Sequence, residues 1–379
     1  MRHFIPYGRQ CINNDDIKAV VDVLKSDWLT QGPAVKEFEQ ALCDYTGAKY
    51  SVAVSSGTAA LHLACHAAGI GANDEVIVPA LTFAATANSV LYAGGKPVFA
   101  DIEEATGNTD ASRIKAKLGP KTKAAIPVHY AGLSCDMREI ARLARRKGLL
   151  IIEDAAHALG AEYNNSKAGS CKYSDMTIFS FHPVKSITTG EGGAILTNSK
   201  DLYHRLVQLR SHGIEKGKLW YYEMKYLGYN YRLTDIQSAL GMSQLKRLDN
   251  FVKRRTEIAE YYDRMLGNNP LLDITGPQEG KRSSHHLYVI RLKECLAAKR
   301  RAFVEMMRES GIGVQVHYIP VYFHPYYRSL GYRKGICPVA ENYYSRIVSI
   351  PVFPTMKDSQ AKYVVQKVLE ICGNLSKKK

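Results

Sequence analysis

Short apolar runs alternate with helical patterns between residues 50 and 200, and this alternation restricts the possible folds more than any other feature. The apolar runs fall at residues 52–54, 75–78, 97–100, 124–128 and 149–152. Helical patterns occupy residues 58–69, 85–93 and 137–147. The run at 149–152, Leu-Leu-Ile-Ile, is continuous, which is typical of a strand buried on both faces. The alternation predicts an α/β fold with a mainly parallel central sheet covered by helices on both faces.

The second part of the chain has a different pattern. A long helical tract is expected from about Leu233 to Leu266. Strand patterns then occur at residues 287–292 and 314–318, and helical patterns at 300–310 and 359–371. We therefore expect a large domain over residues 1–250 and a smaller α+β domain over residues 251–379.

Composition and charge exclude several classes of protein. No segment approaches the roughly 18 consecutive apolar residues of a membrane-spanning helix, so no membrane partner is expected. The eight cysteines are scattered without a C-x-x-C pair. This spacing argues against a metal site or a disulfide framework and favours the cytoplasm. The residues 376–379 at the end of the chain are expected to be disordered.

The net charge of +15 raises the alternative of a non-catalytic, DNA-binding protein. However, the basic residues occur in short helical clusters, such as residues 142–147 and 253–255, and not in one long arm. This distribution favours solvated helix faces, and we expect no nucleic-acid partner. A positive field would also attract an anionic, nucleotide-linked substrate.

Two residues predict the chemistry. Asp154 follows an apolar strand pattern and therefore stands at the end of a buried strand. Lys185 comes later, in the turn Ser180–Gly193, which is rich in Gly, Ser and Thr. Pyridoxal 5'-phosphate (PLP) requires such a pair, because a lysine amine attaches to its aldehyde and a carboxylate keeps its ring nitrogen protonated. The ordered pair predicts a PLP enzyme, with Lys185 and Asp154 as catalytic residues.

A candidate phosphate site lies in the segment Ser55–Ala60, which joins a strand to a helix. Small residues let the backbone approach a ligand closely, and the free N–H groups of a helix N-terminus favour a phosphate. Ser56, Gly57 and Thr58 are therefore candidates for the cofactor phosphate, although a plain helix cap is an alternative. Phe83 follows the next strand and lies either on the cofactor ring or in the core.

Three histidines are candidates for the same site. His129 and His157 follow strands at the same sheet edge, so both are expected to face the site, with a structural role as the alternative. His317 would contact a substrate only if the small domain folds over the cleft.

Five segments together resemble the DegT/DnrJ-type sugar-nucleotide aminotransferases. These segments are Ser56–Leu61, Thr82–Asn88, Asp154–His157, Ser180–Gly193 and Gly228–Gln237. The resemblance spans nearly the whole chain in the right order. It implies a fold-type-I PLP-dependent transferase that forms a homodimer with shared active sites.

The resemblance also implies site residues. For the cofactor they are Lys185, Asp154, His157, Ser56, Gly57, Thr58, Phe83, Ser180 and, from the neighbouring subunit, Asn230. For the substrate they are Tyr7, Asp27, Trp28, Leu29, Thr30, Ser56, His129, Ser180, Asn230, Gln315, Val316, His317 and Tyr318. The N-terminal segment would thus line the substrate site.

The implied reaction is transfer of an amino group from L-glutamate to C4 of a UDP-linked 4-keto-6-deoxy-HexNAc sugar. Within the family, a dTDP-4-keto-6-deoxyhexose or a UDP-4-keto-pentose is an alternative substrate. Related dehydratases and deoxygenases can carry histidine in place of the lysine, so Lys185 argues against that chemistry.

Overall fold

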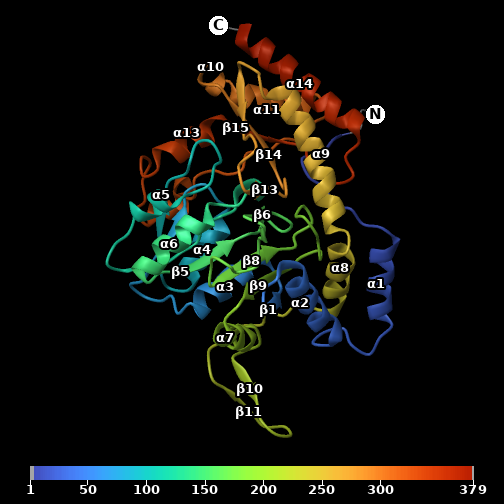
Figure 1. Cartoon of the computed structure of the whole chain (residues 1–379), viewed down its shortest axis with the longest axis vertical. Coiled ribbons are helices and arrows are strands. Elements are labelled where there is room, and N and C mark those ends of the chain that lie inside the picture. Colours follow the sequence, from blue (N-terminus) through green and yellow to red (C-terminus); the bar gives the residue numbers. More distant parts are fainter. Residues whose placement is uncertain (1–3, 378–379) are drawn as a thin grey trace.

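The computed structural model describes residues 4–377, in which a seven-stranded sheet forms the centre (Figure 1). Its strands, in spatial order, are β1 (Tyr50–Val54), β9 (Gly193–Thr197), β8 (Met176–Ser180), β5 (Leu150–Asp154), β4 (Thr122–Ala125), β2 (Glu75–Pro79) and β3 (Lys96–Ala100). Only β9 runs antiparallel to its neighbours β1 and β8, and all other pairs are parallel. The prediction of a mainly parallel sheet is therefore confirmed.

Helices cover both faces of this sheet because successive strand residues point to opposite sides. Val52 and Val54 share a buried cluster with residues of α3 (Gly57–Ala67), α4 (Ala84–Tyr92) and α7 (Lys200–Arg210). Ala53 lies between them and packs on the other face, in a cluster with residues of α2 (Pro33–Thr46) and α8 (Asp235–Leu245). Helix α6 (Met137–Lys147) covers the same face beside β4 and β5.

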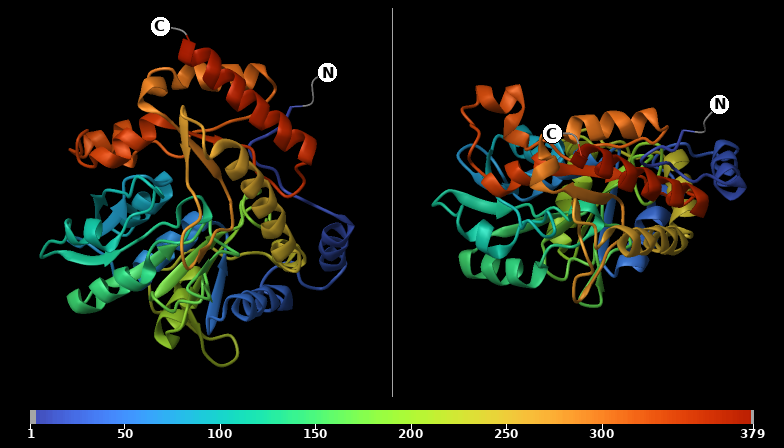
Figure 2. Two further views of the ribbon diagram at one scale, coloured as in Figure 1. Left: turned by 45° about the horizontal axis from the view of Figure 1, so that its top comes forward. Right: turned by 90° about the horizontal axis from the view of Figure 1, so that it is seen from above.

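A smaller antiparallel sheet forms one end of the molecule, at the top of Figure 1. Its order is β12 (Leu272–Ile274), β14 (Tyr288–Leu292) and β15 (Ile347–Ile350). It shares a core with α9 (Leu248–Leu266), α10 (Glu294–Ala297), α11 (Arg300–Glu309) and α14 (Asp358–Lys377). Figure 2 shows α14 lying across this end. Ile5 belongs to the same core, so the N-terminal segment reaches it as well.

The remaining elements are short or peripheral. They are α1 (Asn14–Leu24), α5 (Ala111–Lys115), β6 (Glu162–Tyr163), β7 (Ser166–Lys167), β10 (Ile214–Lys216), β11 (Tyr222–Met224), β13 (Lys281–Arg282), α12 (Pro325–Ser329), α13 (Pro338–Arg346) and the 3₁₀ turns Tyr130–Gly132 and Val321–Phe323. The hairpin β10–β11 projects from the end opposite the small sheet (Figure 1). Within residues 4–377 no helix has the length and apolar character needed to cross a membrane.

Three expectations need correction. The tract from Leu233 to Leu266 is two helices, α8 and α9, which are separated at Lys246 and Arg247; the Arg247 guanidinium bonds to Cys11 O and Asp16. Residues 314–318 are not a strand: only Gln315 pairs, with Ser349. Val314 packs in the small sheet's core, and residues 315–318 line a cavity. Helix α14 extends through residues 376 and 377, which were expected to be disordered, and residues 378–379 lie outside the described chain.

The division of the chain at residue 250 stays a prediction. It falls inside α9, whose first turns pack against the large sheet's cluster through Phe251 and Val252. The later turns of α9 pack in the small sheet's core through Ile258 and Tyr262.

Candidate active site

The carboxyl ends of β1, β5 and β8 meet at one edge of the large sheet, where ligands bind in such folds. Asp154 is the last residue of β5, Ser180 is the last of β8, and Ser56 follows β1. Ser180 pairs with Gly193 of β9, which also pairs with the end of β1. A Cβ atom on Gly193 would lie 2.5 Å from the carbonyl oxygen of Ser56. Glycine at this position therefore allows the three strand ends to approach one another.

Residues 56–58 form a small concave N-terminus on α3. The hydroxyl of Ser56 caps the helix by accepting from the backbone N–H of Ala59, at 3.0 Å. A Cβ atom on Gly57 would lie 2.8 Å from the Cβ of Ser180 and 3.1 Å from its hydroxyl oxygen. The absence of a side chain at Gly57 lets Ser180 pack against the first turn of α3. The N–H groups of this turn and the hydroxyls of Ser56, Thr58 and Ser180 lie at the cavity and are available to a phosphate.

Asp154 is 5% exposed and is held by two hydrogen bonds. The hydroxyl of Thr86 donates to its Oδ2 at 2.7 Å, and the backbone N–H of Ala156 donates to its Oδ1 at 3.2 Å. Burial raises the pKa of Asp154, whereas these two donors and the nearby Lys185 lower it. The carboxyl group of Asp154 thus lies at the cavity, and Thr86 of α4 fixes its orientation.

Lys185 lies in the irregular segment between β8 and β9, where its backbone N–H donates to His182 O at 2.9 Å. Burial lowers the pKa of its amine to about 8, although the charge of Asp154 acts in the opposite direction. A substantial fraction of the amine is therefore neutral near neutral pH, which is the state that attacks a carbonyl group.

One cavity of about 710 Å³ collects most of the expected site residues, and two others, of about 390 and 250 Å³, are smaller. The expected residues that line it are Tyr7, Ser56, Gly57, Thr58, Phe83, Asp154, His157, Ser180, Lys185, Gln315, Val316, His317 and Tyr318. They come from the N-terminal segment, the large sheet and the segment 315–318. The small domain's segment does lie over the sheet edge, as the expectation for His317 required.

Aromatic and imidazole rings connect the wall of this cavity. His157 Nε2 lies 2.9 Å from the hydroxyl of Tyr318. The ring of His317 lies 5.5 Å from that of Tyr7, and its Nδ1 bonds to the hydroxyl of Ser349 at 2.8 Å. The segment 315–318 is thus fixed against both the large sheet and the N-terminal segment.

Six expected residues lie outside the cavity of their own chain. One of them, His129, is buried, and the other five are at the surface. The surface residues are Asp27, Trp28, Leu29, Thr30 and Asn230, and all five are exposed. Asn230 stands between Tyr229 and Tyr231, whose rings stack 5.0 Å apart and whose hydroxyls bond to His66 and His62 of α3. The roles of these five residues toward cofactor and substrate stay predictions, and the role of Asn230 requires a second subunit.

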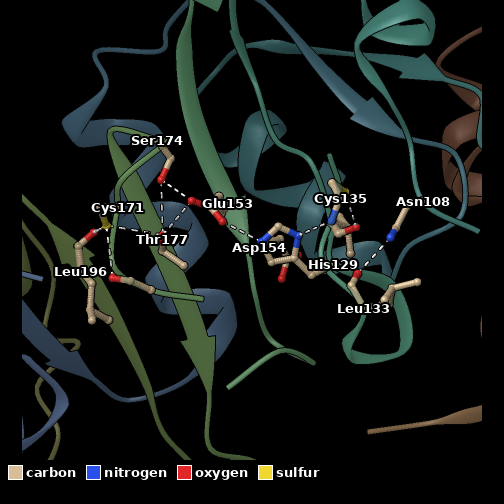
Figure 3. Close-up of polar contacts among 12 residues, drawn as sticks. Asn108, His129, Leu133, Cys135, Glu153, Asp154, Cys171, Ser174, Thr177 and Leu196 are labelled. Atoms are coloured by element: carbon tan, nitrogen blue, oxygen red, sulfur yellow. Dashed lines mark hydrogen bonds and ion pairs between the residues drawn. The ribbon is translucent and has the colours of Figure 1, made fainter. Parts of the chain in front are cut away.

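His129 is a correction. Its ring is 1% exposed, does not line the cavity, and belongs to a buried polar network (Figure 3). His129 Nε2 lies 2.6 Å from a carboxylate oxygen of Glu153, and its Nδ1 accepts from the backbone N–H of Cys135 at 3.2 Å. Its position after β4 places the backbone at the expected edge, but the ring lies on the side of Glu153 and not on that of Asp154. The expectation that this side chain faces the substrate is therefore wrong.

Several cavity residues were not expected from the sequence. The ones with polar side chains are Thr82, Thr86, His182, Glu191, His286 and His324. Thr82 and Thr86 lie within a segment that carries the resemblance, so a signal was present for them. His286 precedes the strand pattern at 287–292 and carries no motif, so nothing local to it indicated a site.

Comparison with known proteins places the chain in a family. Residues 10–369 match the model of the DegT/DnrJ/EryC1/StrS aminotransferase family. The chain belongs to this family. Spore coat polysaccharide biosynthesis protein SpsC of Bacillus subtilis is 42% identical over 380 residues, which are 97% of each chain. UDP-4-amino-4,6-dideoxy-N-acetyl-β-L-altrosamine transaminase of Campylobacter jejuni is 42% identical over 377 residues, 98% of this chain and 99% of that one.

Solved structures of the family agree with the fold. Helicobacter pylori PseC, an aminotransferase involved in the biosynthesis of pseudaminic acid, is 35% identical with a TM-score of 0.94, over 98% of this chain and all of that one. The sugar aminotransferase Spr1654 of Streptococcus pneumoniae, in its PLP-form, is 30% identical with a TM-score of 0.93, with the same coverage. The chain is therefore a PLP-dependent sugar aminotransferase with the fold-type-I architecture, and the predicted fold, enzyme class and cofactor are confirmed.

The cavity itself fits PLP. Ser56, Gly57, Thr58 and Ser180 line the cavity where the first turn of α3 can meet a phosphate. The carboxyl group of Asp154 and the amine of Lys185 line the same cavity. A buried imidazole nitrogen, Nδ1 of His157, has no partner within residues 4–377. These donors and acceptors correspond to the phosphate, ring nitrogen, aldehyde and ring face of the cofactor.

Proposed function

We propose that this aminotransferase transfers the amino group of L-glutamate to C4 of a UDP-linked 4-keto-6-deoxy-HexNAc sugar. The substrate would be UDP-2-acetamido-2,6-dideoxy-β-L-arabino-4-hexulose, and the pathway that of pseudaminic acid. Two similar proteins support this choice: the Campylobacter jejuni transaminase, by its name, and Helicobacter pylori PseC, by its pathway. The structural observation that carries the reaction type is that Lys185 and Asp154 line one cavity large enough for a cofactor and a sugar.

Each residue of the cavity would have a separate role in catalysis or cofactor binding. PLP, when bound, supplies the electron sink that makes a bond at the reacting carbon labile. Lys185 would hold the cofactor covalently, and its amine would then remove the proton from Cα of L-glutamate and deliver one to C4 of the sugar. Asp154 would keep the ring nitrogen protonated, while Ser56, Gly57 and Ser180 anchor the phosphate.

The alternative is that the enzyme aminates another keto sugar used by this family. The similarity of the chain to SpsC is the reason to include such sugars in the assay. SpsC, which is named for spore coat polysaccharide biosynthesis, is as similar to the chain as the Campylobacter jejuni transaminase is. Identity at this level shows the family and the fold, but specificity rests on a few substrate contacts. A dTDP-4-keto-6-deoxyhexose and a UDP-4-keto-pentose are therefore the competing substrates.

The substrate assignment is tested by supplying ¹⁵N-labelled L-glutamate and the holoenzyme with each of the three keto sugars. We expect ¹⁵N at C4 of the UDP-HexNAc product by NMR, with kcat/KM at least tenfold above that of the other two. A higher kcat/KM for either competitor would overturn the substrate and leave the reaction type intact. A Lys185→Ala variant that still aminates any of the sugars would overturn the reaction type.

We also propose a cytoplasmic homodimer with shared active sites. In its support, the hairpin β10–β11 starts next to the bridge between Ser211 and the expected site residue Asn230, and its tip exposes Leu219 at 89% and Trp220 at 83%. Such a surface is typical of an interface. All eight cysteine thiols are free, which is compatible with a reducing compartment.

The shared site has a direct test. Lys185→Ala chains, which are inactive alone, and Asn230→Ala chains, which are weakly active alone, are mixed and allowed to exchange subunits. If Asn230 serves the partner's site, half of the dimers contain one intact site, so the mixture recovers about a quarter of wild-type activity. A mixture that is no more active than its components would contradict the shared site.

A further inference from the structure

His286 is a buried residue that the chemistry described above does not use. It lies directly before β14, and its segment is fixed against the loop that follows β4. The backbone N–H groups of Ser284 and Leu287 donate to Gly132 O and Ala131 O at 3.1 and 3.2 Å. The hydroxyl of Ser284 also donates to His157 O at 2.7 Å. Hydrogen bonds on both sides of His286 thus hold its backbone in place.

The side chain of His286 lines the cavity but has an unused nitrogen. It is 5% exposed, and its Nδ1 has no hydrogen-bond partner within residues 4–377. Buried polar atoms are nearly always paired, so an unpaired one in a reaction cavity indicates a partner that arrives with a ligand. Tyr318 occupies Nε2 of the neighbouring His157, whereas no protein group bonds to the ring of His286 at Nδ1.

The surroundings of His286 keep it neutral in the protein alone. Its ring lies 4.4 Å from that of His157. Burial, His157 and Lys185 together place the pKa of His286 well below its ordinary value. A neutral imidazole carries one N–H group and can donate it to an anion without a competing counter-ion.

The composition of the cavity wall defines the kind of anion. Among the residues that line it within the described chain there are five histidines and no arginine. A carboxylate that enters the cavity can therefore be met, within one subunit, by Lys185, by hydroxyl and N–H groups, or by these imidazoles. The α-carboxylate of an amino acid is bonded directly to the carbon that reacts, so it must come to rest close to the Lys185 amine. His286 lines the same cavity as that amine.

We propose that His286 binds the α-carboxylate of the amino donor through an N–H group of its ring. This inference rests on the proposed function, because it assumes that an amino acid is the donor. The reacting carbon of the keto sugar carries no carboxylate. His286 would therefore serve the donor half-reaction and not the sugar half-reaction.

The test measures the two half-reactions separately with purified holoenzyme. In the first, stopped-flow absorbance follows bleaching of the PLP band by L-glutamate. In the second, enzyme already converted to the pyridoxamine phosphate form reacts with the UDP-4-keto-6-deoxy-HexNAc sugar. For His286→Leu we expect the second-order rate constant for L-glutamate to fall about tenfold to a hundredfold, the factor that a hydrogen bond to a charged group contributes. The rate constant for the sugar should stay within about twofold, since no contact to the sugar is removed.

Two further variants keep this result interpretable. His286→Gln retains an N–H donor, so it should recover a substantial part of the L-glutamate rate even if His286→Leu folds poorly. His285→Asn is the matched neighbour control: His285 does not line the cavity, and its φ of 47° is one that asparagine tolerates. This control should leave both half-reactions unchanged.

The choice of donor tests which carboxylate is bound. Because L-alanine has only the α-carboxylate, His286→Leu should slow L-alanine and L-glutamate by the same factor. Slowing of L-glutamate alone, equal slowing of both half-reactions, or no change would each overturn the proposal. Wild-type enzyme that does not bleach with either amino acid would overturn the donor assignment itself, so the two failures are distinguishable.

Discussion

The contact between Thr86 and Asp154 allows a graded prediction. The hydroxyl of Thr86 is fully buried and lies 2.7 Å from Oδ2 of Asp154 and 2.7 Å from the hydroxyl of Thr82. Since an ionised carboxylate only accepts, the single proton of Thr86 points to Asp154. The proton between the two threonines therefore belongs to Thr82. The order of donation is Thr82 to Thr86 to Asp154.

Valine in place of each threonine removes a hydroxyl with little change of volume. Thr86→Val leaves the buried carboxyl group with the Ala156 N–H as its one remaining hydrogen bond among those in the structure. A hydrogen bond to a charged group contributes about 1.5–3 kcal/mol, so the Asp154-dependent step should slow about 10- to 100-fold. Thr82→Val removes a bond between neutral groups, worth about 0.5–1.5 kcal/mol and one contact further away, and should slow the step less than tenfold.

The assay is the rate at which L-glutamate bleaches the PLP band, measured across pH at equal cofactor content. Because the Thr86 hydroxyl lowers the pKa of Asp154, Thr86→Val should also move the acid limb of the profile to higher pH. A Thr86→Val rate within twofold of wild type would refute the reasoning. An effect of Thr82→Val as large as that of Thr86→Val would do the same.

Three other variants or conditions test separate parts of the structure. Gly57→Ala places a Cβ 2.8 Å from that of Ser180 and should raise the Kd for PLP at least about tenfold in a fluorescence titration of apoenzyme. Gly71→Ala, where a Cβ meets nothing within 4 Å, is its control, and equal Kd values would contradict the phosphate cradle. The rate of PLP attachment should rise as pH increases through about 8, where the Lys185 amine loses its proton, and a rise only above pH 10 would contradict the lowered pKa. His129→Leu leaves the neighbouring buried carboxylate short of a donor, so urea unfolding should show a loss of about 1.5–3 kcal/mol, and a loss below about 0.5 kcal/mol would count against the network in Figure 3.

The large sheet was predictable because its signals are local. The continuous run at 149–152 has the pattern of a strand buried on both faces, and it falls in β5. The helix before it ends at Gly148, which has a φ of 66°, a conformation that glycine adopts without strain. The pairing of Asp154 with Lys185 was predictable for another reason, since the cofactor's chemistry requires both groups.

Side-chain direction after a strand ends was less predictable. His129 follows β4 by four residues, and in that irregular segment the period of two no longer fixes which way a side chain points. For His129 the sequence predicted correctly that the backbone lies at the edge of the sheet where the cavity is. It did not predict the side on which the imidazole ring lies. Residues 314–318 alternate like a strand, yet the segment pairs only at Gln315. Val314 packs in the small sheet's core, and Val316, His317 and Tyr318 line the cavity.

Contacts between distant segments were not predictable from local pattern at all. His286 reaches His157 because the segment before β14 is bonded to the loop after β4. Nothing in the residues around His286 encodes that contact. The same holds for Arg247, whose bonds to the N-terminal segment accompany the break between α8 and α9.

The absorbance spectrum of the purified protein tests the central claim most directly. The account predicts a yellow PLP band that bleaches with L-glutamate and returns when the UDP-4-keto-6-deoxy-HexNAc sugar is added. Both changes should be absent in Lys185→Ala. A protein that shows no PLP band after incubation with the cofactor would contradict the account, and so would a band that neither L-glutamate nor L-alanine changes.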